Sequence, residues 1–426
     1  MDTGDTAWIL ASAALVLLMT PGLAFFYGGM TRAKSVLNMM MMSFAALAIV
    51  PILWVLYGYS FAFSPGGNGL LGGFQRLGFD NIGITTAYGT IPEFVFAAFQ
   101  LMFAILTVAL ISGAIADRAK FSSWLVFIVV WTTIVYFPVA HWVFDFGTSS
   151  DGEGGGWIAT KLEAIDFAGG TAVHINAGAA GLALALVLGR RVGWKRDPMR
   201  PHNLPLVLLG AGLLWFGWIG FNGGSALGAN GLAGLALLNT GVATGAAIAG
   251  WLLYEFIKEG KGTSLGAASG AVAGLVAITP AAAAVSPLGS IVLGLIAGGL
   301  CAWAVSWKWK LGFDDSLDVV GVHLVGGLVG TILIGLLASS NPGGVSVDGL
   351  FYGGNAELLG KQTIAASVVL AYSFILTFVI GKLIDRTIGF RLDPEDEVTG
   401  IDQVEHLESA YDYTGGTGGS PFKTGV

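Results

Sequence analysis

The chain has 426 residues, of which 54% are hydrophobic and only 11% carry a charge. A soluble domain has about 25% charged residues, so this composition indicates a protein that lies largely within a membrane. The formal net charge is −7, and many of the acidic residues lie after residue 392. Nothing in this charge pattern indicates nucleic-acid binding. The 66 glycines have no three-residue period, which excludes collagen, and the single cysteine excludes an intramolecular disulfide.

Eleven stretches are apolar and long enough to cross about 30 Å of hydrocarbon as helices. The first has Asp2 and Asp5 before it instead of a basic region, so we interpret it as a retained helix and not as a signal peptide. The sequence therefore predicts an all-α polytopic membrane protein. In chain order, the predicted spans are 8–29, 37–61, 93–116, 122–144, 167–189, 204–225, 230–257, 265–284, 288–309, 318–339 and 362–388.

The distribution of basic residues predicts the orientation of these spans. With the N-terminus outside, only Arg76, Lys161 and Lys361 among the 20 Lys and Arg residues fall on the outer side. We therefore expect the N-terminus outside and the C-terminus inside. Residues 1–388 would form the membrane domain around a central pore. Residues 389–426 would form a cytoplasmic regulatory tail with a disordered, glycine-rich end.

Two histidines lie in uncharged stretches, His174 in GGTAVHINAG and His323 in DVVGVHLVGG. They fall in the fifth and tenth predicted spans, while GLAFFYGGM in the first span is similar to WIGFNGGSA in the sixth. This pattern predicts two five-helix repeats of opposite orientation plus one extra helix. Glycine and alanine at 168–170 and 177–181 should let the fifth helix approach its neighbours closely.

Ionisable groups inside a membrane are costly, so each is a functional candidate. A neutral imidazole donates from one ring nitrogen and accepts at the other, so His174 and His323 could line a path for a small hydrogen-bonding molecule. Each could instead bond a neighbouring helix, and a pair of histidines could also hold a haem. Zinc needs three or four ligands, and no Cys, His, Asp or Glu cluster accompanies the pair. We therefore expect no metal and no cofactor.

Two acidic residues open the histidine-containing spans, Asp166 before the fifth and Asp318 before the tenth. An acid at a helix N-terminus binds the free N–H groups and is stabilised by the helix dipole. We expect both to support their helices in this way. Asp166, on the outer side, would also attract a cation that enters from outside.

Aromatic residues recur at helical spacing near these spans. Phe99 and Phe103 share one helix face, and Trp218 and Phe221 share another, near Ser225. Such stripes usually serve packing, but a ring face also binds a dehydrated cation, by up to about 2 kcal/mol. No acid lies at mid-membrane to pair with a cation, which suits a substrate that loses its charge before it crosses.

These residues resemble the Amt/Mep/Rh ammonium transporters, particularly the bacterial Amt proteins. The similarity extends over essentially residues 8–390. It rests on the motifs PGLAFFYGG, ILTVALISGAIADR, DFAGGTAVHINAG, MRPHNLP, WIGFNGGSA and DVVGVHLVGG. The resemblance implies a transporter and not an enzyme, assembled as a homotrimer with one pore per subunit in the plasma or inner membrane.

The resemblance also implies a role for each candidate residue. In the outer vestibule, Phe99 and Ser225 match residues that recruit ammonium, and Asp166 matches an acid behind the entrance. The matches along the pore are the twin histidines (His174 and His323), the paired phenylalanine gate (Phe103 and Phe221) and a pore-lining tryptophan (Trp218).

One position departs from the family pattern. Where the family commonly has a vestibule tryptophan before a Gly-Gly-Gly run, this chain has Phe144 in HWVFDFGTSS. Either Phe144 supplies a weaker ring face, or Trp142 or Trp157 folds back to replace it. We expect Phe144, with an effect on ammonium affinity and none on the transport chemistry.

The predicted function is ammonium transport. Ammonium would be concentrated at the outer site, lose a proton on dehydration at the gate, and continue as ammonia along the histidines. The sequence leaves open whether the proton returns outside or crosses separately, and it also allows an ammonium sensor or a proton-coupled carrier of another solute. The tail segment GFRLDPEDEVTGIDQVEHLESAY is similar to the family segment that receives a PII signalling protein, which implies such a partner.

Overall fold

The structure is a computed structural model that describes residues 1–147 and 154–411. The predicted glycine-rich end of the tail lies outside these described residues. The α-helices are α1 (Thr3–Met30), α2 (Val36–Leu53), α3 (Tyr59–Phe63), α4 (Glu93–Ile111), α5 (Phe121–Trp131), α6 (Phe137–Phe144), α7 (Asn176–Leu188), α8 (Leu204–Gly224), α9 (Gly231–Glu259), α10 (Ser264–Ile278), α11 (Pro287–Ala304), α12 (Trp307–Leu311), α13 (Val325–Leu337), α14 (Ala356–Thr387), α15 (Pro394–Thr399) and α16 (Ile401–His406).

Shorter elements interrupt or join these helices. A small antiparallel hairpin, β1 (Ala87–Tyr88) and β2 (Ile91–Pro92), precedes α4. Among the described residues, 3₁₀ turns occupy Leu77–Phe79, Ser112–Ile115, Thr279–Ala281 and Leu350–Tyr352. Turns of π-helix occupy Trp54–Gly58, Thr132–Tyr136, Ile158–Leu162, Gly170–Ile175 and Val320–Leu324.

Eleven helical segments of the described chain are long and apolar enough to cross a membrane, as the sequence predicted. The largest difference at a boundary is in the last segment, which begins at Ala356 and not at residue 362. Its first turns are polar but still helical, because Asn355 accepts a hydrogen bond from the Glu357 amide at 2.8 Å. The segments are Thr3–Met30, Val36–Phe63, Glu93–Ile115, Phe121–Phe144, Gly170–Leu188, Leu204–Gly224, Gly231–Glu259, Ser264–Ala281, Pro287–Leu311, Val320–Leu337 and Ala356–Thr387.

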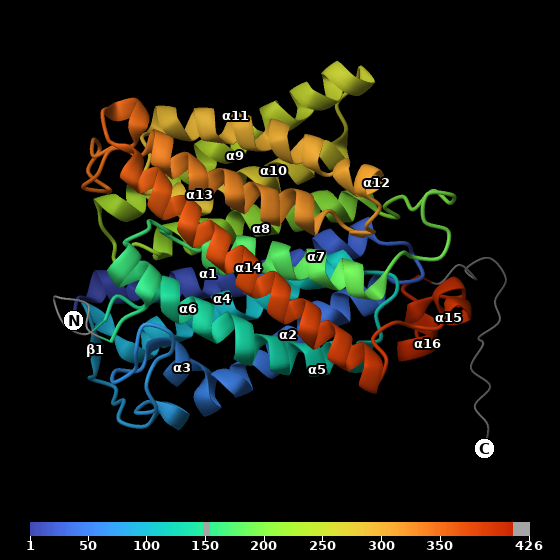
Figure 1. Ribbon diagram of the computed structural model, residues 1–426, viewed down its shortest axis with the longest axis horizontal. Coiled ribbons are helices and arrows are strands. Elements are labelled where there is room, and N and C mark those ends of the chain that lie inside the picture. Colours follow the sequence, from blue (N-terminus) through green and yellow to red (C-terminus); the bar gives the residue numbers. More distant parts are fainter. Residues whose placement is uncertain (148–153, 412–426) are drawn as a thin grey trace.

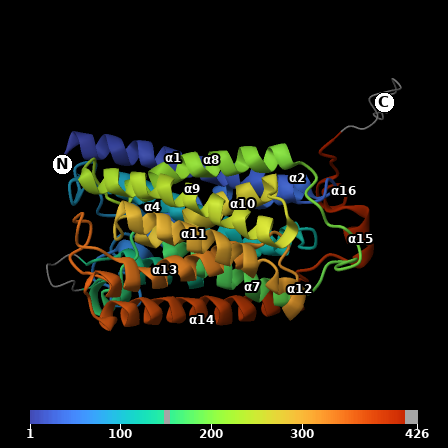
Figure 2. The ribbon, with the colours of Figure 1, turned by 90° about the horizontal axis from the view of Figure 1, so that it is seen from above.

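The helices form one bundle (Figure 1). The helices run roughly along one direction, and α14 crosses diagonally over the face of the bundle that is turned to the viewer (Figure 1). Figure 2 shows α1 beside α8 at one edge of the bundle and α14 at the opposite edge. The N-terminus and the tail helices α15 and α16 lie at opposite ends of the bundle, as an odd number of spans requires.

Glycines bring the fifth and tenth spans together at backbone distance. A Cβ atom on Gly178 would lie 2.3 Å from the backbone nitrogen of Leu324, which no real side chain tolerates. A Cβ atom on Gly327 would lie 3.1 Å from the Cβ atom of His174. The close approach predicted for the fifth helix is thus present, and it places both histidine-containing segments side by side.

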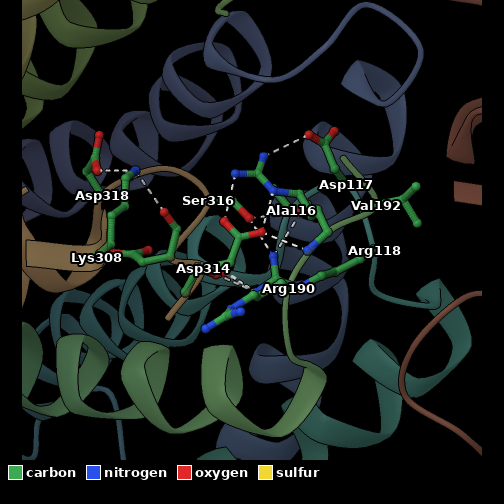
Figure 3. A network of polar contacts seen from close by, with 12 residues as sticks. Ala116, Asp117, Arg118, Arg190, Val192, Lys308, Asp314, Ser316 and Asp318 are labelled. Carbon is green, nitrogen blue, oxygen red and sulfur yellow. Dashed lines mark hydrogen bonds and ion pairs between the residues drawn. The ribbon is translucent and has the colours of Figure 1, made fainter. Parts of the chain in front are cut away.

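A buried polar network joins the interhelical loops at the end of the bundle that carries the tail (Figure 3). The Arg118 guanidinium donates to the Ser316 hydroxyl and to the Asp314 carbonyl, both at 2.6 Å. Burial lowers the pKa of Arg118 to about 10, so the group is still a cation at neutral pH. The neighbouring Arg191 donates to both carboxylate oxygens of Asp314 at 2.9 Å. These bonds fix the loops that follow the third, fifth and ninth spans to one another.

The tail docks on this same end of the bundle. The Asp402 carboxylate accepts hydrogen bonds from the backbone amides of Leu37 (3.0 Å) and Asn38 (2.8 Å) in the first turn of α2. The buried Glu397 accepts from the Val192 amide at 2.6 Å and pairs with Arg391 at 2.8 Å. The tail residues up to His406 therefore act as a structured cover that caps one membrane helix.

Candidate functional site

A hollow of about 230 Å³ lies at the end of the bundle opposite the tail, beside β1 and the first turns of α4. Five predicted site residues line it: Phe99, Phe103, Phe144, Asp166 and Ser225. They come from segments far apart in the sequence. The geometry therefore gathers the predicted outer residues into one concave site.

Aromatic rings form much of its wall. Phe99 and Phe103 are four residues apart on α4, and their ring centroids are 4.9 Å apart. The Phe144 ring lies 6.3 Å from that of Phe103, nearly perpendicular to it. The structure thus places Phe144 at the hollow. Trp142 instead lies against Tyr372, at 4.6 Å between centroids, and donates its indole N–H to the Leu70 carbonyl at 2.9 Å.

Ser225 contributes a polar atom at the edge of the hollow. It caps the end of α8, and its hydroxyl donates to the Phe221 carbonyl at 2.8 Å. Because the hydroxyl hydrogen is used in this bond, the oxygen can only accept a hydrogen bond from a ligand.

Two stacked phenylalanine rings lie next to the hollow. Phe103 and Phe221 stack with their centroids 4.1 Å apart and an interplanar angle of 27°, and both are almost fully buried. The centroid of Phe221 is in turn 6.2 Å from that of His174. The stacked rings therefore lie between the hollow, which Phe103 lines, and His174.

His174 and His323 meet beyond this pair of rings, both almost fully buried. Their Nδ1 atoms are 3.3 Å apart, so if they share a hydrogen bond, one ring donates and the other accepts. Both residues lie in π-helical turns, Gly170–Ile175 and Val320–Leu324, which widen the helix at equivalent points of the two repeats. The Nε2 atom of His174 is buried and has no partner among the described residues. It is available to a small donor or acceptor.

Trp218 fixes the position of the first imidazole. Its ring stacks on that of His174 with a centroid distance of 5.3 Å and an interplanar angle of 19°. The indole N–H donates to the Thr279 hydroxyl at 2.8 Å, and that hydroxyl donates to the Leu275 carbonyl at 2.7 Å. Trp218 was predicted from the sequence, but Thr279 was not, because a single threonine in an apolar helix belongs to no recognisable motif.

Asp166 closes the N-terminal end of the segment that carries His174. Its carboxylate accepts from the amides of Gly169 (2.8 Å), Gly170 (2.7 Å) and Thr171 (2.7 Å), and also from the Thr171 hydroxyl. Burial raises the pKa of this carboxyl, and the donated hydrogen bonds oppose that rise. The predicted support of the fifth helix is therefore visible, and the same side chain lines the hollow.

The corresponding prediction for Asp318 was wrong. Its carboxylate pairs with the Lys308 ammonium at 2.6 Å and does not bind the N-terminus of the tenth span. Asp315 occupies that place and accepts from the amides of Val319 (3.1 Å) and Val320 (2.8 Å). The sequence spacing could have identified Asp315, because it precedes His323 by eight residues, just as Asp166 precedes His174 by eight.

A further histidine, His141, which the sequence analysis did not single out, anchors the end of the fourth span that lies beside the hollow. His141 lies three residues before Phe144, with Nδ1 2.9 Å from the Ala62 carbonyl and Nε2 2.6 Å from the Asn68 carbonyl. Carbonyl oxygens only accept, so both ring nitrogens must carry hydrogen, and the Asp145 carboxylate at 3.2 Å balances the charge. This imidazolium ties the loop after α3 to the helix end that presents Phe144.

Comparison with known proteins agrees with this geometry. The model of the Ammonium Transporter Family matches residues 7–411. The chain belongs to the ammonium transporter family. It is 59% identical over 440 residues to an ammonium transporter of Mycobacterium tuberculosis, covering 98% of this chain and 92% of that protein. An ammonium transporter of Bacillus subtilis is 49% identical over 414 residues, with coverage of 96% and 99%.

Solved structures of family members have the same fold. The Candida albicans Mep2 crystal structure matches with a TM-score of 0.83 and 33% sequence identity, over 93% of this chain and 87% of that one. A structure described as a sensor Amt protein matches with a TM-score of 0.85 and 28% identity, over 95% and 98%. The resemblance predicted from the motifs and the eleven-helix membrane fold are thereby confirmed for this ammonium transporter family member.

Proposed function

We propose that this protein recruits ammonium in the outer hollow, removes a proton from it and conducts ammonia along the histidine pair. The observation that supports this most strongly is the alignment of three features. They are an aromatic hollow with an acceptor hydroxyl, a stacked pair of rings beneath it, and two touching imidazoles beyond the rings.

The hollow suits a small cation that can donate hydrogen bonds. The faces of Phe99, Phe103 and Phe144 attract positive charge, and Ser225 offers an oxygen that only accepts. The Asp166 carboxyl group, which also lines the hollow, adds negative charge near these aromatic rings. Since its carboxylate is occupied by backbone amides, it acts on the substrate through its field and not by direct contact.

The path beyond the rings suits a neutral molecule. A charge moved into a low-dielectric interior costs several kcal/mol, and the described residues around the two imidazoles offer no acid to offset that cost. Ammonia pays no such penalty, and it can hydrogen-bond to ring nitrogens. Passage between Phe103 and Phe221 therefore favours loss of the proton.

Potassium tests this proposal because it resembles ammonium in size and charge but has no proton to lose. In proteoliposomes, labelled methylammonium should enter while labelled rubidium, a stand-in for potassium, stays at the level of empty liposomes. Equal entry of both ions would contradict deprotonation. Current recordings on ammonium addition then distinguish an electrogenic uniporter, which carries current, from a neutral gas channel, which does not.

A sensor is the second candidate function, and two observations favour it. One of the similar structures is described as a sensor Amt protein, and the docked tail caps α2 through Asp402. A movement of α2 would therefore reach the tail. A variant that binds ammonium without transport but still elicits a cellular nitrogen response would support this role.

We also propose the cellular setting expected from the family. The protein would form a homotrimer in the plasma or inner membrane, with the hollow outside and the tail helices inside. The tail surface around α15 and α16 would receive a PII-type signalling protein. Mass measurement of the detergent-solubilised protein tests the trimer, and a pull-down with the chain truncated after Arg391 tests the tail as a docking site.

A further inference from the structure

One side chain of the outer hollow has no place in the proposed function so far. Gln100 lies on α4, where its spacing from Phe96 and Phe103 places the three side chains on one helix face, with Phe99 adjacent in sequence. All four line the hollow. Gln100 therefore sets a single amide into an otherwise aromatic stripe at the point where ammonium would bind.

The amide of Gln100 is buried without a partner. The residue is only 8% exposed, and its Oε1 atom has no hydrogen bond within the described part of the chain. A buried polar group without a partner destabilises a protein, so such groups call for an explanation. A packing role would be met better by an apolar side chain of the same shape.

Two other polar side chains of the hollow, Asp166 and Ser225, already make hydrogen bonds. Both carboxylate oxygens of Asp166 accept from the backbone at Gly169 to Thr171, and the Ser225 hydroxyl donates to the Phe221 carbonyl. Ammonium carries four N–H donors, and Ser225 can meet only part of that need. The uncommitted acceptor in this stripe is the Gln100 amide.

We propose that the Gln100 amide oxygen is a direct ligand of ammonium in the outer hollow. Rotation about the last side-chain torsion is broad for glutamine, so the oxygen can turn toward the cation. A neutral amide attracts the cation without pairing with its charge, and it therefore does not oppose the later loss of a proton. This inference rests on the proposed function and adds a specific ligand to it.

The variant Gln100→Met tests the ligand role because it keeps the length of the side chain and removes the acceptor. The KM for methylammonium uptake should rise about 10-fold, the usual effect of one hydrogen bond to a charged group, while Vmax changes little. The Tm of the ligand-free protein should not fall, because no existing hydrogen bond is lost. The rise in Tm that ammonium produces should shrink.

Gln362 provides a matched control. It is fully buried, and its amide accepts from the Ile165 amide and donates to the Ile165 and Thr331 carbonyls, at 2.7, 2.7 and 3.1 Å. Gln362→Met should therefore lower Tm and leave KM unchanged, the reverse of the result expected for Gln100→Met. Gln100→Glu keeps an acceptor oxygen and should restore a KM at or below that of the wild type.

Each outcome has a separate meaning. A KM for Gln100→Met within two-fold of the wild type overturns the ligand role while leaving transport itself intact. A marked loss of Tm or of folding in Gln100→Met also overturns it, because the amide would then have a structural partner. If the wild-type protein takes up no methylammonium, the proposed function fails first, and the Gln100 inference fails with it.

Discussion

The Asp166 carboxylate holds the turn before His174 through several buried hydrogen bonds. Asp166→Ala removes the acceptor of three backbone amides, those of Gly169, Gly170 and Thr171, at 2.7 to 2.8 Å. Each buried donor left without a partner costs about 1–3 kcal/mol. Asp166 lines the hollow, so water can enter the space that the carboxylate would leave, and we expect the lower part of that range, about 3–5 kcal/mol in total. For a chain of this length, 1 kcal/mol corresponds to about 1 °C in Tm.

The internal repeat supplies the control for this prediction. Asp315 occupies the equivalent place before His323 but accepts from only two amides, at 3.1 and 2.8 Å. Asp315→Ala should therefore cost about two-thirds as much. Thermal unfolding in detergent measures both, and methylammonium uptake shows whether His174 is still positioned. If Asp166→Ala lowers Tm no more than Asp315→Ala does, the amide hydrogen bonds do not set the stability of this turn.

Three further predictions concern the hollow, the inner loops and the tail. Phe144→Trp offers a ring that binds cations more strongly, so the KM for ammonium should fall about two- to five-fold in uptake assays; an unchanged KM would remove Phe144 from the binding site. Burial and the charge of Asp318 raise the pKa of Asp315 to about 7 from an ordinary 3.8, so its proton favours the folded state at low pH, and this contribution is lost as the pH rises through 7. The Tm of Asp315→Asn minus that of the wild type should therefore increase as the pH rises from about 5 to about 8. A Tm difference that does not change with pH would contradict the raised pKa. Asp402→Ala removes two hydrogen bonds to α2, so limited proteolysis should cut the tail faster; cutting at the wild-type rate would show that Asp402 does not hold the tail.

Much of the fold could be predicted from the sequence because membrane helices carry a strong signal. Each span must satisfy its backbone internally and face lipid or apolar neighbours, so hydropathy alone locates the eleven segments. The structure also brings the aromatic candidates Phe99, Phe103 and Phe144 together at one hollow and places the two histidines in contact. Their positions follow from helical spacing and from the glycines that bring the spans together.

The rest depends on contacts that no local pattern encodes. Asp318 lies nearer in sequence to the apolar tenth span than Asp315 does, so the hydropathy pattern pointed to Asp318 as the acid that binds the N-terminus of that helix. Asp318 has a positive φ of 65°, and the chain bends there, so its side chain meets Lys308 from another segment. The lack of a partner for the Gln100 amide oxygen within the described residues, and the bond from Trp218 to Thr279, likewise become visible only when separate helices are packed together.

The central claim is that ammonia crosses along the two imidazoles, and the double variant His174→Ala, His323→Ala tests it most directly. In proteoliposomes, uptake of labelled methylammonium should fall to the level of empty liposomes, while Tm shows that the protein is folded. His202→Ala serves as a control, because this histidine bonds the Thr31 carbonyl at 3.0 Å near the tail, away from the path. Uptake by the folded double variant at the wild-type rate would contradict the account.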